Sequence, residues 1–336
     1  MDCYVARLSI FLITVVLIVG MVGCAPRGGE IRDWYDLHAI RKNLGGSYVL
    51  MNDLDSTSAG YEKLASPTAN GGEGWQPLLA CRFWTGPPCY GFSGTFDGQG
   101  YEIHDLFINR PDEDCVALFS VVDPGGRIED IGLVNVTVTG RGMVGGLVGV
   151  SYSGGTVTGS YSIGSVTGTD MVGGLVGVIW EGTVSNSYST CSVSGGNGYG
   201  TGGVVGQNNG GTVSNCYATG SVTGGVRVGG LVGDSSGPLS NSYSTGTVTG
   251  EYFVGGLVGE NGEGTVSNSF WDIQTSGQAA SRVGTGKTTA EMKDITTFSG
   301  AGWNITAVAL GQTNSAYIWN ILDGLTYPFL SWPSVS

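Results

Sequence analysis

The sequence predicts an all-β protein built as a parallel β-solenoid, a right-handed β-helix in which each turn of the chain stacks on the previous one. Three observations predict this fold. A glycine-rich phrase recurs at a nearly constant period, each period holds short β-prone runs, and no period has the spacing of an amphipathic helix. The prediction applies to residues 91–270, which form the repeat region.

The recurring phrase is Gly-Gly-Leu-Val-Gly, with one Leu-to-Val variation. Its five copies are separated by 28, 29, 27 and 26 residues. They begin at Gly145, Gly173, Gly202, Gly229 and Gly255. A degenerate copy begins at Val116, 29 residues before the first of them. A fixed period of about 20–50 residues is typical of solenoids and repeat arrays.

Each period contains three β-prone runs, Leu-Val, Thr-Val-Ser and Ser-Val-Thr, which are separated by glycines. Alternating β-branched residues bounded by glycine indicate strands, and we expect the glycines to supply the positive φ of tight corners. Without a crossover helix, each strand pairs in parallel with its copy in the next coil. The valines and leucines then point inward and stack on their counterparts about 4.8 Å away.

Two further files of residues follow the same period. Asparagine recurs at one corner, where stacked amides are expected to bond along the rod, at Asn186, Asn215, Asn241 and Asn268. An aromatic file lies beside it, at Tyr161, Tyr188, Tyr217, Tyr243 and Phe270.

These units resemble GLUG-motif repeats, which occur in bacterial and archaeal surface proteins, adhesins and the non-catalytic part of some immunoglobulin A peptidases. The resemblance covers about residues 30–336 and includes the flanks. Those flanks are Phe92 to Gly98, Ser269 to Asp272, Gly284 to Met292 and Tyr327 to Trp332. The resemblance implies a cell-surface β-helical protein used for adhesion or ligand binding, and it implies architecture more directly than activity.

The chain divides into four segments. Residues 1–24 are expected to be a signal peptide, and residues 25–90 an N-terminal cap made of a helix, a strand and an irregular loop. Residues 91–270 are the solenoid, and residues 271–336 are an aromatic C-terminal cap. Caps are expected at both ends because the first and last coils would otherwise expose open strand edges.

The N-terminal segment has the features of an export signal. Arg7 precedes an apolar run from Leu8 to Val22, which is short for a membrane span. The run ends in Met-Val-Gly-Cys, which resembles a lipobox and makes Cys24 the candidate lipidation site. We therefore expect an extracellular or lipid-anchored cell-surface protein of a bacterium or archaeon; plain secretion and a retained anchor are the alternatives.

The composition limits the partners. Charged residues make up 12% of the chain and the net charge is −13. An acidic chain without basic clusters disfavours nucleic acid and anionic membranes as partners. Membrane contact is expected only through the N-terminal lipid, the partner is expected to be an extracellular ligand or glycan, and the protein is expected to be a monomer.

The cysteines suggest one disulfide. Cys81 and Cys89 lie eight residues apart in an irregular stretch of an exported chain, a context that favours a bond between them. Cys191 and Cys216 occupy different positions of the repeat, so their Cα atoms should be too far apart to bridge. Cys115 is expected to be a small inward residue.

No catalytic constellation is present in the sequence. Its two histidines, His38 and His104, are far apart, and the zinc-protease and nucleophile-elbow motifs are missing. The run Ser281 to Thr288 ends like a phosphate loop, but Thr288 and Glu291 have capping-box spacing. We therefore expect no cofactor, no metal and no enzymatic activity. The alternative is a polysaccharide lyase or glycosidase, which would need carboxylates clustered in one groove.

The candidate binding face is the Ser/Thr-Val-Ser/Thr cassette, whose hydroxyls are expected to point outward as a grid of roughly 7 by 5 Å. Its residues are Thr137, Thr139, Ser165, Thr167, Ser192, Ser194, Ser221, Thr223, Thr247 and Thr249. Glycan binding or adhesion is the favoured use of this face, and ice binding is a minor alternative. The aromatic residues after Ser269 are expected to pack over the last open coil, although aromatic rings also bind sugars.

Overall fold

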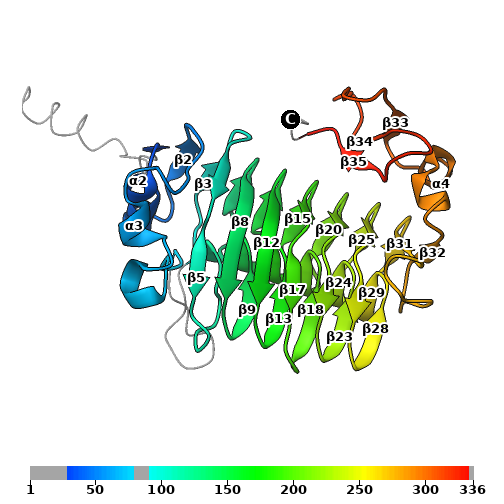
Figure 1. Cartoon of the computed structure of the whole chain (residues 1–336), viewed down its shortest axis with the longest axis horizontal. Coiled ribbons are helices and arrows are strands. Elements are labelled where there is room, and N and C mark those ends of the chain that lie inside the picture. Colours follow the sequence, from blue (N-terminus) through cyan, green and yellow to red (C-terminus); the bar gives the residue numbers. More distant parts are fainter. Residues whose placement is uncertain (1–28, 79–90, 333–336) are drawn as a thin grey trace, which may run out of the picture.

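The computed structural model describes residues 29–78 and 91–332, which form one rod of stacked β-coils (Figure 1). The predicted all-β parallel solenoid is confirmed, with a short helical segment at the N-terminal end and an irregular aromatic segment at the C-terminal end. None of the helices in the described ranges is long and apolar enough to cross a membrane.

Four sheets run along the rod, because each strand pairs in parallel with its copy one coil later. Sheet A consists of β1 (Gly29–Ile31), β2 (Ser47–Leu50), β3 (Thr95–Asp97), β7 (Arg127–Glu129), β11 (Thr156–Thr158), β15 (Thr183–Ser185), β20 (Thr212–Ser214), β25 (Leu239–Ser240) and β30 (Val266–Ser267). Sheet C consists of β6 (Phe119–Val122), β10 (Val148–Tyr152), β14 (Val176–Trp180), β19 (Val205–Asn209), β24 (Val232–Ser235) and β29 (Val258–Asn261).

Sheet B is the longest and carries both the aromatic file and the Ser/Thr cassette. Its strands are β4 (Glu102–His104), β5 (Phe107–Asn109), β8 (Gly132–Thr139), β12 (Tyr161–Thr167), β16 (Tyr188–Ser189), β17 (Ser192–Ser194), β21 (Tyr217–Ala218), β22 (Val222–Thr223), β26 (Tyr243–Ser244), β27 (Val248–Thr249), β31 (Phe270–Asp272) and β32 (Thr285–Lys287). Sheet D consists of β9 (Gly142–Gly145), β13 (Asp170–Gly173), β18 (Tyr199–Gly202), β23 (Val226–Gly229) and β28 (Tyr252–Gly255).

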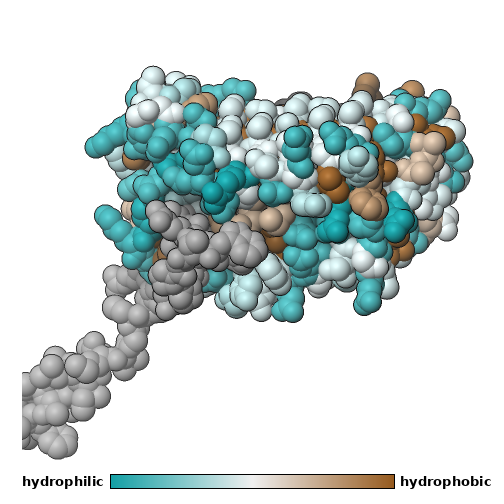
Figure 2. All heavy atoms as spheres, turned by 90° about the horizontal axis from the view of Figure 1, so that it is seen from below, coloured by the Kyte–Doolittle hydropathy of each residue, from teal (hydrophilic) through white to brown (hydrophobic). Residues whose placement is uncertain are grey.

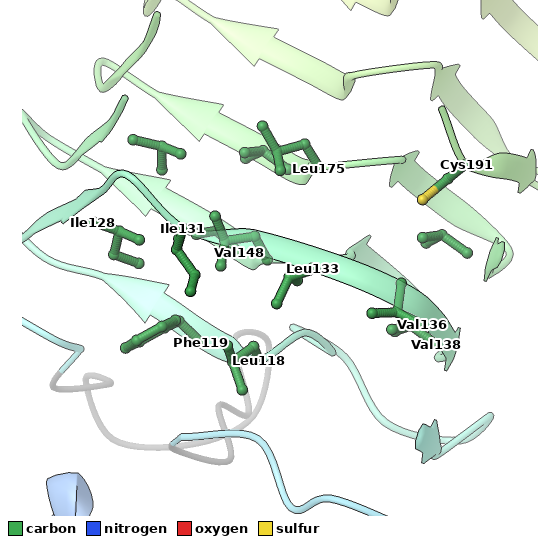
Figure 3. Packing of buried hydrophobic residues seen from close by; sticks show 14 of the residues in the cluster. Leu118, Phe119, Ile128, Ile131, Leu133, Val136, Val138, Val148, Leu175 and Cys191 are labelled. Atoms are coloured by element: carbon green, nitrogen blue, oxygen red, sulfur yellow. The ribbon is translucent and has the colours of Figure 1, made fainter. Parts of the chain in front are cut away.

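The interior of the rod is mainly aliphatic, with Phe96 and Phe119 in the first coils, and equivalent residues of successive coils stack on one another. Val148 pairs with Val176 and Val176 with Val205, and all three are fully buried. In Figure 3, Leu118, Leu133 and Val148 lie within the same enclosed space between the sheets. The predicted inward stacking of the repeated valines and leucines is therefore confirmed.

The number of strands in a coil differs from the prediction of three. The residues just before each glycine-rich phrase, such as Asp170–Gly173, form an additional strand of sheet D. The chain then turns through Gly174 and Leu175 and returns as β14 of sheet C. Sheet D therefore lies closely against sheet C, an arrangement that strand propensities alone did not indicate.

The glycines of the phrase are required for close approach, and the expected positive φ is not found at them. A Cβ atom on Gly173 would collide with the carbonyl oxygen of Val176, and one on Gly174 with that of Gly203. On Gly177 it would lie 2.6 Å from the carbonyl carbon of Met143 in sheet D. The phrase thus encodes backbone contact between two sheets.

The positive φ of one corner is supplied mainly by asparagine. The angles at Asn186, Asn215, Asn241 and Asn268 are 48°, 52°, 48° and 47°. Asparagine adopts this left-handed region more readily than most other residues. The Nδ2 group of Asn215 donates a hydrogen bond of 3.1 Å to Oδ1 of Asn186, so the predicted amide ladder is confirmed at this step.

The N-terminal end of the rod is covered by short helices. They are α2 (Trp34–Ala39), the 3-10 turn η1 (Ile40–Lys42), α3 (Tyr61–Leu64) and the 3-10 turn η2 (Ala69–Gly72). Asp33 caps α2 by accepting hydrogen bonds from the N–H groups of Tyr35 and Asp36. Trp34, Leu37 and Ile40 are fully buried against the first coils.

The C-terminal aromatic residues lie along the side of the rod, which differs from the expected packing over its open end. This segment contains η3 (Glu291–Lys293), α4 (Ile295–Ser299), β33 (Ile305–Ala307), β34 (Trp319–Ile321) and β35 (Phe329–Leu330). Trp303, Trp319 and Trp332 pack on the tyrosine file of sheet B, and β35 leads back along the rod (Figure 1). The tyrosine rings provide an apolar surface outside the solenoid, which explains why these residues gather there.

Candidate binding site

The predicted Ser/Thr face lies on the outside of sheet B and is brought together as one grid. Thr137 pairs with Ser165 and Ser165 with Ser192, while Thr139 continues through Thr167 to Ser194. Eight of the ten side chains are exposed, and only Thr139 and Ser165 are half-buried. The Oγ atoms of Ser221 and Ser192 lie 3.3 Å apart. None of these ten residues carries an aromatic ring.

The predicted covalent sites are outside the described residues. Cys24, Cys81 and Cys89 all fall in ranges that the structure does not describe. Cys115, Cys191 and Cys216 are buried and form no disulfide. Burial raises the pKa of the Cys115 and Cys216 thiols to about 12, so both are neutral at physiological pH and resemble small core residues.

A cleft forms where the asparagine corner is interrupted. One and two coils before Asn186, the equivalent positions are Gly159 and Asp130, and both keep a positive φ, 58° and 53°. Gly159 has no side chain, and the Asp130 carboxylate lies over it, with Oδ1 2.0 Å from where a Cβ of Gly159 would be. The resulting pocket has a volume of about 350 Å³ and is also lined by Thr158, Tyr317 and Trp332.

The folded-back C-terminal segment forms the aromatic wall of this cleft. The ring of Trp332 lies 6.3 Å from that of Tyr161 and 6.4 Å from that of Tyr188, tilted by 39° to each. Trp332 also lines a second pocket of about 390 Å³, together with Asp97, Asp130 and Tyr161. One indole therefore separates two adjoining pockets that share the Asp130 carboxylate.

The electrostatics of the cleft are acidic. Burial, followed by the neighbouring carboxylates of Glu129 and Asp97, raises the pKa of Asp130. Burial and the hydrogen bond that Tyr161 donates to Glu102 raise the pKa of the Tyr161 hydroxyl, which stays neutral. The cleft thus combines carboxylate, amide and hydroxyl groups with an aromatic face. These groups hydrogen-bond and stack with polar ring compounds.

Sequence reasoning missed the cleft and assigned Trp332 to the end cap. A signal was present in the period, because Asp130 and Gly159 are the two departures from asparagine in an otherwise regular corner. The repeat pattern did not predict which segment of the chain would cover that corner. Within the described parts of the chain, no group of three or more His, Cys, Asp or Glu side chains is placed to hold a metal ion.

The fold defines the class of protein as a parallel β-solenoid with a lateral aromatic segment. Residues 197–223 match the family model of the GLUG motif. The chain therefore carries GLUG-motif repeats, which confirms the resemblance seen in the sequence.

Two relatives match about a third of the chain. Halomucin of Haloquadratum walsbyi is 32% identical over 125 residues, which are 36% of this chain and 1% of the relative. A protein of Evansella cellulosilytica, named as a candidate Gly-rich membrane protein, is 32% identical over 121 residues, which are 34% of this chain and 12% of the relative. The chain thus spans only a small part of either relative.

A solved structure has the same fold over almost the whole chain. It is the crystal structure of a Bacteroides ovatus protein described as a candidate immunoglobulin A1 protease. The TM-score is 0.64 at 20% sequence identity, and the match covers 93% of this chain and 94% of that one. At this identity the likeness shows the fold alone.

Proposed function

We propose that this protein is a non-catalytic cell-surface β-solenoid that binds an extracellular glycan. The surface location is supported by the membrane-protein name of one relative and by the export-type N-terminal segment. The binding role rests on the cleft under Trp332, where an indole, the Asp130 carboxylate and the Asn186 amide line one pocket. Such a site is complementary to a sugar ring, whose apolar face stacks on the indole while its hydroxyls form hydrogen bonds with the polar groups.

The Ser/Thr face has a supporting role in this proposal. Sheet B begins at the asparagine corner that holds the cleft and continues to the exposed hydroxyl grid. A glycan chain anchored at Trp332 gains weak additional hydrogen bonds if it extends over that grid. Adhesion then results from one aromatic anchor and a polar surface beside it.

The test is glycan-array binding of the purified full chain, followed by titration of the strongest glycan hit. Trp332→Ala is expected to weaken binding at least tenfold, about 1.4 kcal/mol, because stacking is lost. Trp332→Phe retains a ring and is expected to keep most of the affinity, and Thr223→Ala on the hydroxyl grid is the matched surface control. Absence of any glycan hit, or equal affinity of wild type and Trp332→Ala, would overturn the proposal.

Binding without turnover is favoured by the state of the neighbouring carboxylates. Glu129 forms an ion pair with Arg127, and Asp97 accepts a hydrogen bond of 2.8 Å from the backbone N–H of Gln99. Each neighbouring carboxylate already has a partner within the protein, whereas a glycosidase needs two carboxylates that both act on the substrate. Depolymerisation of an array hit by wild type, abolished in Asp130→Asn, would instead support a carbohydrate-active enzyme.

Anchoring and cross-linking of the chain are further parts of the proposal. We expect Cys24 to carry the lipid, so a fatty-acid analogue should label wild type and not Cys24→Ala. We expect Cys81 and Cys89 to be bonded in the exported protein, so reduction should increase the mass of this stretch by two hydrogens. An unlabelled wild type, or two thiols that react without prior reduction, would contradict these two points.

A further inference from the structure

We propose that a second pocket, on the outer side of the rod where sheets D and C meet, binds a single neutral sugar residue. This pocket is about 360 Å³ and shares no residue with the cleft under Trp332. Its lining residues come from β13, β18, β19, β23 and β24. The inference goes beyond the proposed function, because the two sites are built from different parts of the coil.

The pocket exists because glycine replaces a larger residue at one position, Gly200, in a row of equivalent residues along sheet D. The second residue of each sheet D strand has a positive φ, namely Met143, Met171, Gly200, Arg227 and Phe253 at 54°, 52°, 75°, 58° and 54°. The side chains of Met143 and Met171 pack with Val121, Val150 and Val178 on the outer face of sheet C. Gly200 provides no such cover, so a hollow opens between the flanking coils.

The outer face of sheet C changes from apolar to polar at the same place. Val178 pairs in register with Gln207, and Gln207 pairs with Asp234. The hollow at Gly200 is therefore bounded by Met171 on one side and by Gln207, Arg227 and Asp234 on the other. Figure 2 views the rod from below and shows hydrophilic and hydrophobic residues intermixed on this face.

The polar groups are held in place by one another and still leave hydrogen-bonding capacity. Arg227 Nη1 donates to Asp234 Oδ2 at 2.7 Å, and Gln207 Nε2 donates to the same oxygen at 3.2 Å. Arg227 Nε is buried and has no hydrogen-bond partner among the described residues. A buried donor without a partner is costly, and a ligand oxygen would satisfy it.

An aromatic ring completes the pocket. Tyr199 is 58% exposed, and its ring lies 5.6 Å from the guanidinium carbon of Arg227. The backbone N–H of Tyr199 donates to Asp170 Oδ1 at 2.9 Å, which fixes the strand at this point. Tyr199 thus offers an exposed ring beside a pre-formed Arg–Asp–Gln cluster.

These features together favour a neutral polyol over other ligands. The carboxylates of Asp170 and Asp234 and the net charge of −13 oppose an anion, while the pairing of Asp234 with Arg227 makes it a weak site for a cation. Hydroxyl groups both donate and accept, so one sugar can bond the Asp234 carboxylate and the exposed part of the Arg227 guanidinium together. The small volume and the single exposed ring match one sugar residue.

The test is NMR titration of the full chain with methyl α-mannoside, methyl β-glucoside, methyl β-galactoside and N-acetylglucosamine. At least one of these probes is expected to bind saturably. Gly200→Met places in the hollow the side chain that Met171 carries one coil earlier, at a compatible φ, and is expected to weaken binding at least tenfold. Asp234→Asn retains shape and is expected to weaken it severalfold.

Matched controls separate this pocket from the cleft. Tyr252 occupies the position of Tyr199 two coils later and is 63% exposed, so Tyr252→Ala tests for nonspecific loss of an exposed ring. Tyr252→Ala is expected to bind the same probe as wild type does, and the NMR signals of the pocket residues are followed separately from those of the cleft under Trp332. Lack of saturable binding by all four probes would overturn the inference, as would unchanged affinity in both Gly200→Met and Asp234→Asn.

Discussion

The protein has two cores of different character, one inside the solenoid and one outside it. The inner core is mainly aliphatic, and through the repeats its residues pack on their counterparts in the next coil, as Val148 does on Val176. The outer core is aromatic and lies between the tyrosine file and the C-terminal segment. The rings of Tyr161, Tyr188, Tyr217 and Tyr243 stack at centroid separations of 4.8, 4.6 and 5.2 Å.

The difference shows what repetition can and cannot specify. In the inner core the same contacts recur between successive coils, so every coil packs on its neighbours with the same few residue types. The outer core needs a non-repeating partner, and its hydrogen bond from the Tyr243 hydroxyl to the carbonyl oxygen of Pro328 joins residues 85 apart. The cleft under Trp332 lies where the C-terminal segment reaches the earlier coils of the rod, next to Tyr161.

The largest expected effect is in the inner architecture, at the third glycine of the phrase. Gly177→Ala puts a methyl group between two backbone segments that cannot move independently, so we expect a loss of about 4 kcal/mol or more. Gly154→Ala is the control, because Gly154 has a φ of 90° and no atom near its missing Cβ. Denaturant unfolding measures both. Equal losses in the two variants would contradict this, because sheet contact at Gly177 would then cost no more than alanine at the positive φ of Gly154.

A somewhat smaller effect is expected in the aromatic core. Tyr243→Ala removes a fully buried ring and should cost about 3–4 kcal/mol, while Tyr243→Phe should cost about 1–2 kcal/mol by leaving the Pro328 carbonyl unpaired. Circular dichroism and limited proteolysis should show the C-terminal segment released while the solenoid remains folded. Loss of both together would mean that the two cores form one cooperative unit.

Alkaline pH should act mainly on the aromatic core. Burial raises the pKa of Tyr188, Tyr217 and Tyr243 above the usual value of 10.0. Above pH 10 the unfolded chain releases tyrosine protons that the folded chain keeps, so stability falls as pH rises. Each such tyrosine contributes up to about 1.4 kcal/mol per pH unit. Tyr217→Phe should make the decline shallower between pH 10 and 11, and identical slopes would contradict this.

The smallest expected effect is at the asparagine corner. Asn215→Ala loses the ladder bond to Asn186 and places alanine at a φ of 52°, so we expect a loss of about 1 kcal/mol. Asn215→Gly keeps the conformational freedom and should lose less. Thermal unfolding of the pair separates the two contributions. A glycine variant less stable than the alanine variant would show that the amide and side-chain packing, and not φ, control this corner.

Several features of the fold were predictable because they recur. The period predicted parallel stacking, the alternation of valine with serine or threonine predicted which side chains point inward, and the asparagine positions predicted a corner. The reason for the glycines was not predictable from one unit, because the atoms that exclude a Cβ at Gly177 belong to Met143 in the preceding coil. The two pockets were missed because each arises where the repeat departs from itself, at Gly159 and at Gly200.

The sequence by itself determined the solenoid, because stacking of identical coils needs only contacts that every repeat supplies. The tertiary structure alone decided that sheet D folds against sheet C and that the C-terminal tryptophans cover the tyrosine file. The physical reason is that these contacts join chemically different segments at separations unrelated to the period. The repeat pattern therefore does not predict which residue of a non-repeating segment contacts which coil.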